Sequence, residues 1–356
     1  MKISISLVVV IVVLALGLMG ASILPSCDRS NDGGVYKSTD SGNAWDQKTY
    51  ISEDENLSNV DVMSIAVNPA DSNIIYLGVK GQGIYKTTDG GDVWRRVLPS
   101  DVDIFAIAID PKDPNIVYAS SLAEDNGKIF KSPNGFEETV EEILVEAQGG
   151  LALVDIIIDH YNTSIIYALS EQGGIFKSTD AGATWAAVYW FDGDLAAMGM
   201  SPTDSRVIYV GTKDRGLLKT IDGGESWTEI EAIFKEQDMS EGANISDLAV
   251  VSTDTIYTAT WHGLLRTNDG GVTWEEVNAL LRPGEVPVKT LVVPVSSPNV
   301  IYFANGNVLH KSTNSGETWS NLLLPTARTI SVLVVDPNNI ETIYAGVIKE
   351  QDDEIF

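Results

Sequence analysis

The sequence predicts an all-β protein built as a seven-bladed β-propeller of four-stranded antiparallel blades. One turn motif recurs seven times along the chain, at a period of roughly 45 residues that is typical of radial or stacked β repeats. Each copy lies in a longer pattern of four short β-type runs, and four strands per period favour a propeller blade over a solenoid coil. The two ends of the chain each supply half of this pattern, which indicates a closed ring.

The cleanest repeat defines four expected strands, which we name A to D. In that repeat they are 62–69, 73–79, 83–87 and 94–97. The next repeat supplies 104–111, 116–120 and 128–132, with a weakly marked strand D near Ile143. These runs are rich in Ile, Val and Tyr and are separated by Gly, Pro, Asn and Asp, the composition of strands and of the turns that join them.

The turn between strands C and D, which we call the C–D turn, carries residues with mechanical roles. In the copy from Ser38 to Trp45, the Asp40 carboxylate is expected to cap the turn by accepting backbone N–H bonds two residues on. Gly42 supplies a left-handed backbone conformation. The tryptophan is an apolar wedge between blades, and replacing it with Ala typically costs about 3–5 kcal/mol. The predicted structural turn residues are Asp40, Trp45, Asp89, Trp94, Asn134, Asp180, Trp185, Asp222, Trp227, Asp269, Trp274, Asn314 and Trp319.

The same residues do not predict a metal site. Each turn offers one carboxylate at most, whereas calcium takes about six to eight oxygen ligands. The chain also lacks Gly-rich phosphate loops, nucleophile elbows and paired-cysteine metal motifs. We therefore expect no metal and no cofactor.

The repeat resembles a known family. Ser/Thr-x-Asp-x-Gly-x-Thr-Trp, placed after a Gly-hydrophobic-aromatic-Lys strand, is similar to the Asp-box, or BNR, repeat. The form Asn-Ile-Ile-Tyr-x-Gly followed by Gly-x-Tyr-Lys-Ser/Thr resembles sortilin-type, xyloglucanase-type and photosystem II assembly-factor propellers. The resemblance covers nearly everything after residue 33 and implies a propeller fold. It implies no single activity, because the same box occurs in enzymes and in non-enzymes.

The ends of the chain indicate how the ring closes. The first copy, from Gly34 onward, supplies only strands C and D, and the segments 329–337 and 342–348 supply only A and B. Pairing them would complete a seventh blade and leave no exposed edge strand. We therefore expect one propeller domain over 34–356. Because 343–356 resembles 117–130, the alternative is a truncated gene that stops inside a further strand C.

The first 33 residues predict that the protein is located outside the cytoplasm. A basic start and an apolar run from Ile3 to Leu24 indicate a secretory signal over 1–26, and Leu24-Pro25-Ser26-Cys27 resembles a bacterial lipobox. Cys27 would then be lipidated, with 27–33 as a short tether and the propeller as an envelope lipoprotein. The alternative is an uncleaved anchor helix, since about 20 apolar residues can span a bilayer. With one cysteine, no disulfide scaffold forms.

The net charge of −27 limits the partners. Nucleic acid is excluded because phosphate binding needs a basic footprint, and an anionic membrane surface would repel the domain. We expect a monomer that binds a protein or carbohydrate ligand.

The ligand is expected on the face where the D-to-A and B-to-C connections emerge, which we call the top face; the C–D turns lie on the opposite face. Only two tryptophans, Trp190 and Trp261, lie outside the C–D turns, and both fall in top-face segments. Aromatic platforms with a few polar groups suit sugars or peptide side chains. The predicted ligand-binding residues are Trp190, Phe191, Lys213, Arg215, Trp261 and His262. His160 and His310 occupy repeat positions and are expected to be structural.

Acidic residues offer a second, catalytic interpretation. Aligned strand A starts place Asp61, Asp103 and Asp194 at one equivalent position near the channel mouth. An inverting glycosidase needs two such carboxylates about 6.5–9.5 Å apart. The top-face arginines Arg215, Arg282 and Arg328 could hold a substrate carboxylate in a sialidase-like enzyme.

Three functions follow from these observations. The first is a membrane-anchored, non-catalytic recognition or scaffold propeller outside the cytoplasm. The second is a glycoside hydrolase, sialidase-like or xyloglucanase-like. The third is a photosystem-type assembly factor, although the acidic chain lacks the arginine-rich patch that the resemblance implies. We favour the first.

Overall fold

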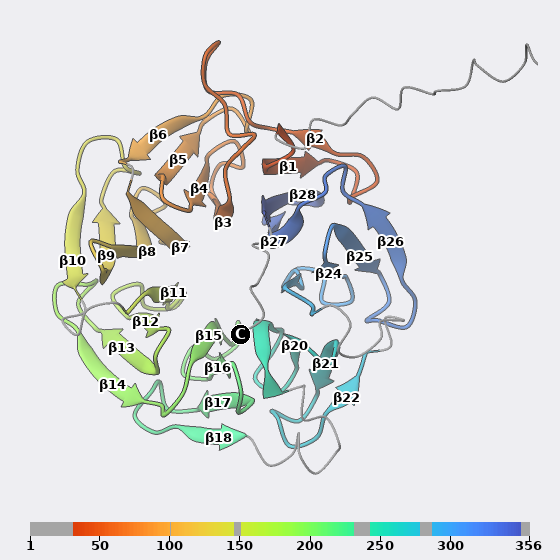
Figure 1. Cartoon of the computed structure of the whole chain (residues 1–356). Coiled ribbons are helices and arrows are strands. Elements are labelled where there is room, and N and C mark those ends of the chain that lie inside the picture. The colour runs from red at the N-terminus through yellow and green to blue at the C-terminus, as the bar shows by residue number, and fades with distance from the viewer. Residues whose placement is uncertain (1–30, 100, 146–150, 231–242, 278–286, 350–356) are drawn as a thin grey trace, which may run out of the picture.

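A computed structural model describes residues 31–99, 101–145, 151–230, 243–277 and 287–349. Within these ranges the strands form seven four-stranded antiparallel sheets, which stand as blades around a central channel (Figure 1). The fold class predicted from the repeats is therefore confirmed. The signal and lipobox segment 1–26, Cys27 and the loop 231–242 lie outside the described residues, as do Arg282 and the segment 350–356.

Each blade runs from an innermost strand A to an outermost strand D. Blade 1 consists of β27 (Thr329–Asp336), β28 (Asn339–Ile348), β1 (Gly34–Ser38) and β2 (Asp46–Gln47), and blade 2 of β3 (Val62–Val67), β4 (Ile75–Val79), β5 (Gly83–Thr87) and β6 (Arg95–Leu98). Blade 3 consists of β7 (Val102–Ile109), β8 (Val117–Ala123), β9 (Asn126–Ser132) and β10 (Glu141–Val145), and blade 4 of β11 (Leu153–Ile158), β12 (Ile166–Ser170), β13 (Gly174–Ser178) and β14 (Ala186–Trp190). Blade 5 consists of β15 (Leu195–Met200), β16 (Ile208–Thr212), β17 (Leu217–Thr220) and β18 (Thr228–Ile230), and blade 6 of β19 (Ile245–Val250), β20 (Ile256–Thr260), β21 (Leu264–Thr267) and β22 (Glu275–Glu276). Blade 7 consists of β23 (Thr290–Val292), β24 (Ile301–Asn305), β25 (Val308–Ser312) and β26 (Ser320–Leu323).

Blade 1 combines strands from both ends of the sequence. Strand β28 pairs antiparallel with β1, in a register that runs from Gly34 opposite Val347 to Ser38 opposite Ile343. The backbone groups of β28 are thus paired on both sides, with β1 and with β27. No edge strand is left at the ring seam.

The core lies between blades. Strand B of every blade carries a buried tyrosine, and the aromatic residue of the next blade's C–D turn packs into the same apolar cluster. In the copy that lacks a tryptophan, Phe136 meets Tyr76 edge-on with ring centroids 6.3 Å apart. Each large ring removes roughly 150–250 Å² of apolar surface from water, so these pairs supply much of the adhesion between blades.

A polar contact accompanies each apolar one. In blade 4, the Lys177 ammonium lies 5.3 Å from the centroid of the Tyr167 ring and donates to the Gly223 carbonyl of the next C–D turn at 2.7 Å. The Tyr167 hydroxyl donates to the same carbonyl at 2.8 Å. Equivalent lysine–carbonyl bonds start from Lys37, Lys86, Lys131 and Lys219. A cation held over an aromatic face and a buried carbonyl therefore fastens one blade to the next.

The C–D turns differ in one detail from the expectation. The Asp180 carboxylate accepts the Thr184 amide at 2.8 Å, four residues on rather than two, because the Ser178 hydroxyl takes the nearer amides of Asp180 and Gly182. Its second oxygen accepts the Thr184 hydroxyl at 2.6 Å. These bonds lower the pKa of Asp180 to about 2. All donors to this carboxylate come from its own turn, which fits a structural role.

Candidate functional site

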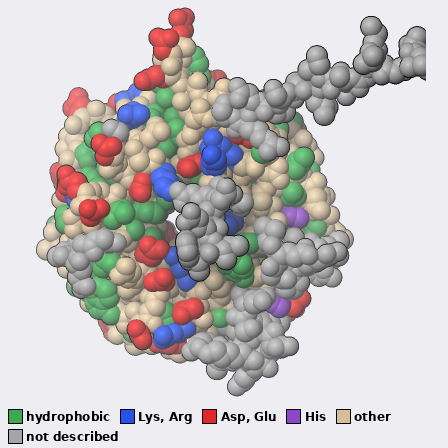
Figure 2. Space-filling view, in the orientation of Figure 1, with side chains coloured by type: hydrophobic (Ala, Val, Ile, Leu, Met, Phe, Trp, Pro, Cys, Tyr) green, Lys and Arg blue, Asp and Glu red, His purple; other side chains and the backbone are tan. Residues whose placement is uncertain are grey.

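A pocket of about 500 Å³ opens at the channel mouth on the top face, and all seven blades contribute to its lining. In the space-filling view, acidic and basic side chains surround the central opening (Figure 2). The pocket wall itself is mostly apolar, with Met63, Phe105 and Val154 among its residues. A concave apolar surface with few polar groups is the usual form of a ligand site.

The pocket is built by β-bulges near the start of the innermost strands. In six blades the register between strands A and B shifts by one residue, for example between Val62 and Ser64. The extra residue of a bulge is freed from the ladder and turned to a new direction. The bulge residues, with Lys289 at the matching place in blade 7, all line the pocket: Met63, Phe105, Val154, Ala196, Ser246, Lys289 and Ser331. We call these seven side chains the channel ring.

The pocket rim contains two of the predicted ligand-binding residues. Trp261, in the turn between β20 and β21, is 45% exposed and lines the pocket. Lys213 also lines it and forms an ion pair with Glu171 at 2.5 Å, between blades 5 and 4. The structure thus brings Trp261 and Lys213 to one opening. Their role in binding remains a prediction.

The other four predicted ligand-binding residues lie elsewhere. Trp190 ends the outermost strand β14 and packs edge-on against Phe176, with ring centroids 5.9 Å apart. Phe191 is buried, and the Arg215 guanidinium lies 5.3 Å from the centre of its ring. The structure therefore does not bring Trp190 and Trp261 together, because Trp190 ends an outermost strand and Trp261 lies at the channel.

His262 faces away from the pocket. Its Nε2 lies 2.6 Å from a carboxylate oxygen of Glu276 on the outermost strand β22, and it is absent from the pocket lining. His310 stacks on Phe303 with centroids 4.4 Å apart, and burial lowers its pKa. The His160 ring contacts the Tyr161 ring in an opposite-face turn, with centroids 4.3 Å apart and the planes tilted by 50°. His160 and His310 thus occupy packing positions, as expected.

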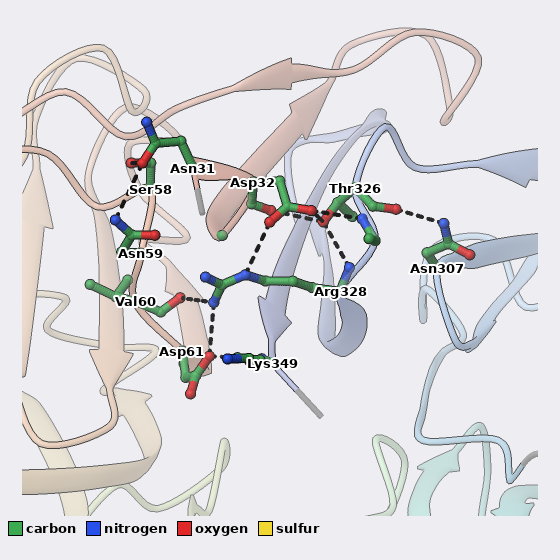
Figure 3. Close-up of polar contacts among 12 residues, drawn as sticks. Asn31, Asp32, Ser58, Asn59, Val60, Asp61, Asn307, Thr326, Arg328 and Lys349 are labelled. Atoms are coloured by element: carbon green, nitrogen blue, oxygen red, sulfur yellow. Dashed lines mark hydrogen bonds and ion pairs between the residues drawn. The ribbon is translucent and has the colours of Figure 1, made fainter. Parts of the chain in front are cut away.

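Asp61 belongs to a network that joins the two ends of the chain (Figure 3). The Arg328 guanidinium bonds Asp32 at 3.3 Å and Asp61 at 3.0 Å, and only 10% of its side chain is exposed. The same Asp61 oxygen accepts the Lys349 backbone amide at 2.8 Å. The predicted catalytic carboxylate and the predicted substrate-binding arginine are therefore partners in an internal ion pair. Their ion pair joins blade 1 to blade 2, next to the seam between the chain ends.

The other two predicted catalytic carboxylates, Asp103 and Asp194, lie outside the pocket lining. Asp103 accepts the Gly81 amide at 2.6 Å and so fixes the neighbouring turn between β4 and β5. Asp194 is exposed and its backbone carbonyl accepts the Lys213 amide at 3.0 Å. Neither lines the pocket.

Two other carboxylates, which the sequence reasoning missed, follow the bulges directly. Asp155 accepts the amide of Ile156 in its own strand at 2.8 Å and that of Met198 in the next blade at 2.7 Å. Asp247 accepts the Leu291 amide of the next blade at 2.9 Å. Desolvation at these blade contacts raises the pKa of Asp155 to about 7 and that of Asp247 to about 6. Both carboxylates bridge neighbouring blades.

Within the described ranges, no three His, Cys, Asp or Glu side chains gather as metal ligands would. The same residues include no helix long and apolar enough to cross a membrane.

The fold and its pocket define a class, the seven-bladed β-propellers with an open channel mouth. Among solved structures, the chain is similar to a GH74 xyloglucanase from Xanthomonas campestris, with a TM-score of 0.66 at 17% identity over 81% of this chain and 51% of that one. It is also similar to YCF48 bound to D1 peptide, with a TM-score of 0.63 at 15% identity over 82% and 93%. YCF48 from Cyanidioschyzon merolae gives 0.62 at 12% identity, over 81% and 95%.

At these identities the likeness establishes the fold alone. The chain spans about half of the xyloglucanase, 51% of its length. No protein-family model matches the chain, and no curated protein matches it by sequence.

Proposed function

We propose that this protein is a non-catalytic recognition propeller that binds a polypeptide segment of a protein partner at the channel mouth. The observation that carries the proposal is the pocket of about 500 Å³, lined by all seven blades and largely apolar. Burying apolar surface contributes roughly 25 cal/mol per Å², so a wall of this kind favours ligands with apolar side chains.

The apolar wall favours a peptide over a sugar. Sugar hydroxyl groups set against Met63, Phe105 and Val154 would lose water without gaining hydrogen-bond partners, at a cost of about 1–3 kcal/mol for each unsatisfied group. The solved structure of YCF48 with a D1 peptide supports a peptide ligand for this fold. The exposed Trp261 keeps a glycan as the second candidate, since the fold is shared with GH74 enzymes.

The absence of catalysis is also part of the proposal. Asp61 is held by Arg328 and by the Lys349 amide, and Asp103 is held by the Gly81 amide. A general acid and base must be free to exchange protons with substrate or water, and these bonds commit the two carboxylates to the scaffold.

We further propose membership of the Asp-box repeat family and an extracytoplasmic, membrane-anchored location. The serine–aspartate bonds of the C–D turns support the first. The apolar run from Ile3 to Leu24 and the lipobox-like Cys27 support the second. Labelling with a palmitate analogue in a bacterial host, compared with Cys27→Ala, tests the anchor, and an unlabelled wild-type chain would refute lipidation.

The proposed function is tested by screening the purified protein against a peptide library, a glycan array and a hydrolysis panel of sialosides and β-glucans. The matched control is Ala196→Trp, which fills the channel mouth from a bulge position. We expect peptide binding that this variant abolishes, and no turnover. Turnover that is lost in Asp61→Asn, or binding that survives Ala196→Trp, would contradict the proposal.

A further inference from the structure

The channel ring is chemically divided, although its seven positions are equivalent. Blades 2 to 5 supply Met63, Phe105, Val154 and Ala196, while blades 6, 7 and 1 supply Ser246, Lys289 and Ser331. One half of the ring is thus apolar and the other polar. A ligand that contacts both halves of the ring must itself carry apolar and polar groups.

The polar half contains an exposed cation. Lys289 is exposed, and within the described ranges no ion pair or hydrogen bond engages its ammonium. This differs from Lys213 of blade 5, which is paired with Glu171. The chain has a net charge of −27, so most of its surface repels a carboxylate. An exposed cation in the channel ring attracts a ligand carboxylate instead.

Two other side chains at the polar half are already engaged. The Ser331 hydroxyl donates to the Val62 carbonyl at 2.6 Å and lies 3.1 Å from the Gly346 carbonyl, so its proton is already used inside the ring. Asp247, one residue beyond Ser246, accepts the Thr290 hydroxyl at 3.0 Å. Lys289 is therefore the charged member of this half of the ring, beside the neutral donors Ser246 and Asn244 that also line the pocket.

Resting on the proposed function, we propose that the ligand is an acidic–apolar polypeptide segment. A large aliphatic or aromatic side chain would pack on Met63, Phe105 and Val154, and a neighbouring Asp or Glu carboxylate would pair with Lys289. Exposed charge pairs of this kind contribute modestly to affinity, about fivefold, and more to the choice of partner.

The test measures fluorescence anisotropy of capped peptide probes with the full chain in detergent. The probe holds two aspartates beside an isoleucine and a phenylalanine. In one control probe asparagines replace the aspartates, and in the other alanines replace the two apolar residues. We expect each control probe to bind at least about fivefold more weakly than the parent.

Matched protein variants locate the effect. Lys289→Gln is expected to weaken the parent probe about fivefold and to leave the asparagine probe unchanged, whereas Lys80→Gln, on an exposed turn outside the pocket, changes neither. Val154→Thr keeps shape while adding a hydroxyl, and should weaken both probes that contain the apolar pair.

The outcomes separate the two proposals. Equal affinity for the aspartate and asparagine probes, or no effect of Lys289→Gln, would overturn the acidic preference while peptide recognition stands. Binding of a library peptide that Ala196→Trp blocks, without any binding of these probes, would overturn the ligand chemistry alone. No peptide binding of any kind would refute the proposed function itself.

Discussion

At the residue scale, Asp61 lies where the repeat alignment places it, but its contacts give it a role that the alignment does not predict. The sequence alignment of repeats places it at a strand A start beside the channel, as the structure does. Its partner Arg328 lies 267 residues away in sequence, and the ion pair forms only because blade 1 joins the two chain ends. No local sequence pattern predicts such a contact, and the sequence alone therefore suggests a catalytic role for Asp61.

This assignment predicts a stability effect from the Asp61–Arg328 pair. Asp61→Asn and Arg328→Met should each lower the free energy of unfolding by about 1–3 kcal/mol, because each removes a charge-assisted hydrogen bond, although Arg328 keeps its bond to Asp32 and Asp61 keeps the Lys349 amide. The double variant should lose less than the sum. Urea unfolding of the two single variants and the double variant checks this, and additive losses would contradict the pairing.

At the element scale, the strands were predictable and the bulges were not. The runs of Ile, Val and Tyr predict strands A to C, because burial between blades selects those residues. The outermost strands are exposed and less clearly marked, as in β2 and β22. A bulge residue breaks the alternation of faces without a marker in sequence: Met63, Phe105 and Ser331 share a place in the ring and no side-chain type. The top face was therefore predicted, and the pocket-lining ring was not.

The blade-to-blade lysine contact yields a prediction at this scale. Lys177→Met should destabilise the propeller by about 1–2 kcal/mol, since the Gly223 carbonyl loses a charged donor and the Tyr167 ring loses its cation. Lys80→Met, an exposed control, should cost less than about 0.5 kcal/mol. The thermal midpoints of both variants, measured by calorimetry, test this. Equal midpoints would show that the bond from Lys177 to the Gly223 carbonyl does not stabilise the blade contact.

At the scale of the whole molecule, two sets of carboxylates shape stability in opposite directions. Asp155 and Asp247 have raised pKa values, so their favourable contribution is complete below an unfolded pKa near 4 and is lost as pH rises towards 6–7. Turn aspartates such as Asp180 and Asp269 have pKa values lowered to about 2, so their contribution is complete above pH 4 and is lost on acidification.

The two sets predict maximal stability at mildly acidic pH. The thermal midpoint should be higher near pH 5 than at pH 8 or pH 3. In the double variant Asp155→Ala, Asp247→Ala the loss between pH 5 and 8 should be smaller, whatever its effect on absolute stability. Scanning calorimetry at the three pH values measures this. The same change in thermal midpoint between pH 5 and 8 in the variant and the wild type would show that Asp155 and Asp247 are not responsible.

The central claim is that recognition takes place at the channel mouth and not at the blade perimeter. The measurement that tests it most directly is the affinity of a library-selected peptide for the wild type, Trp261→Ala and Trp190→Ala. Trp261 lines the pocket, so its truncation should weaken binding at least about tenfold. Trp190, at the end of an outermost strand, should be dispensable to within about twofold. Loss of binding in Trp190→Ala with full affinity in Trp261→Ala would contradict the account.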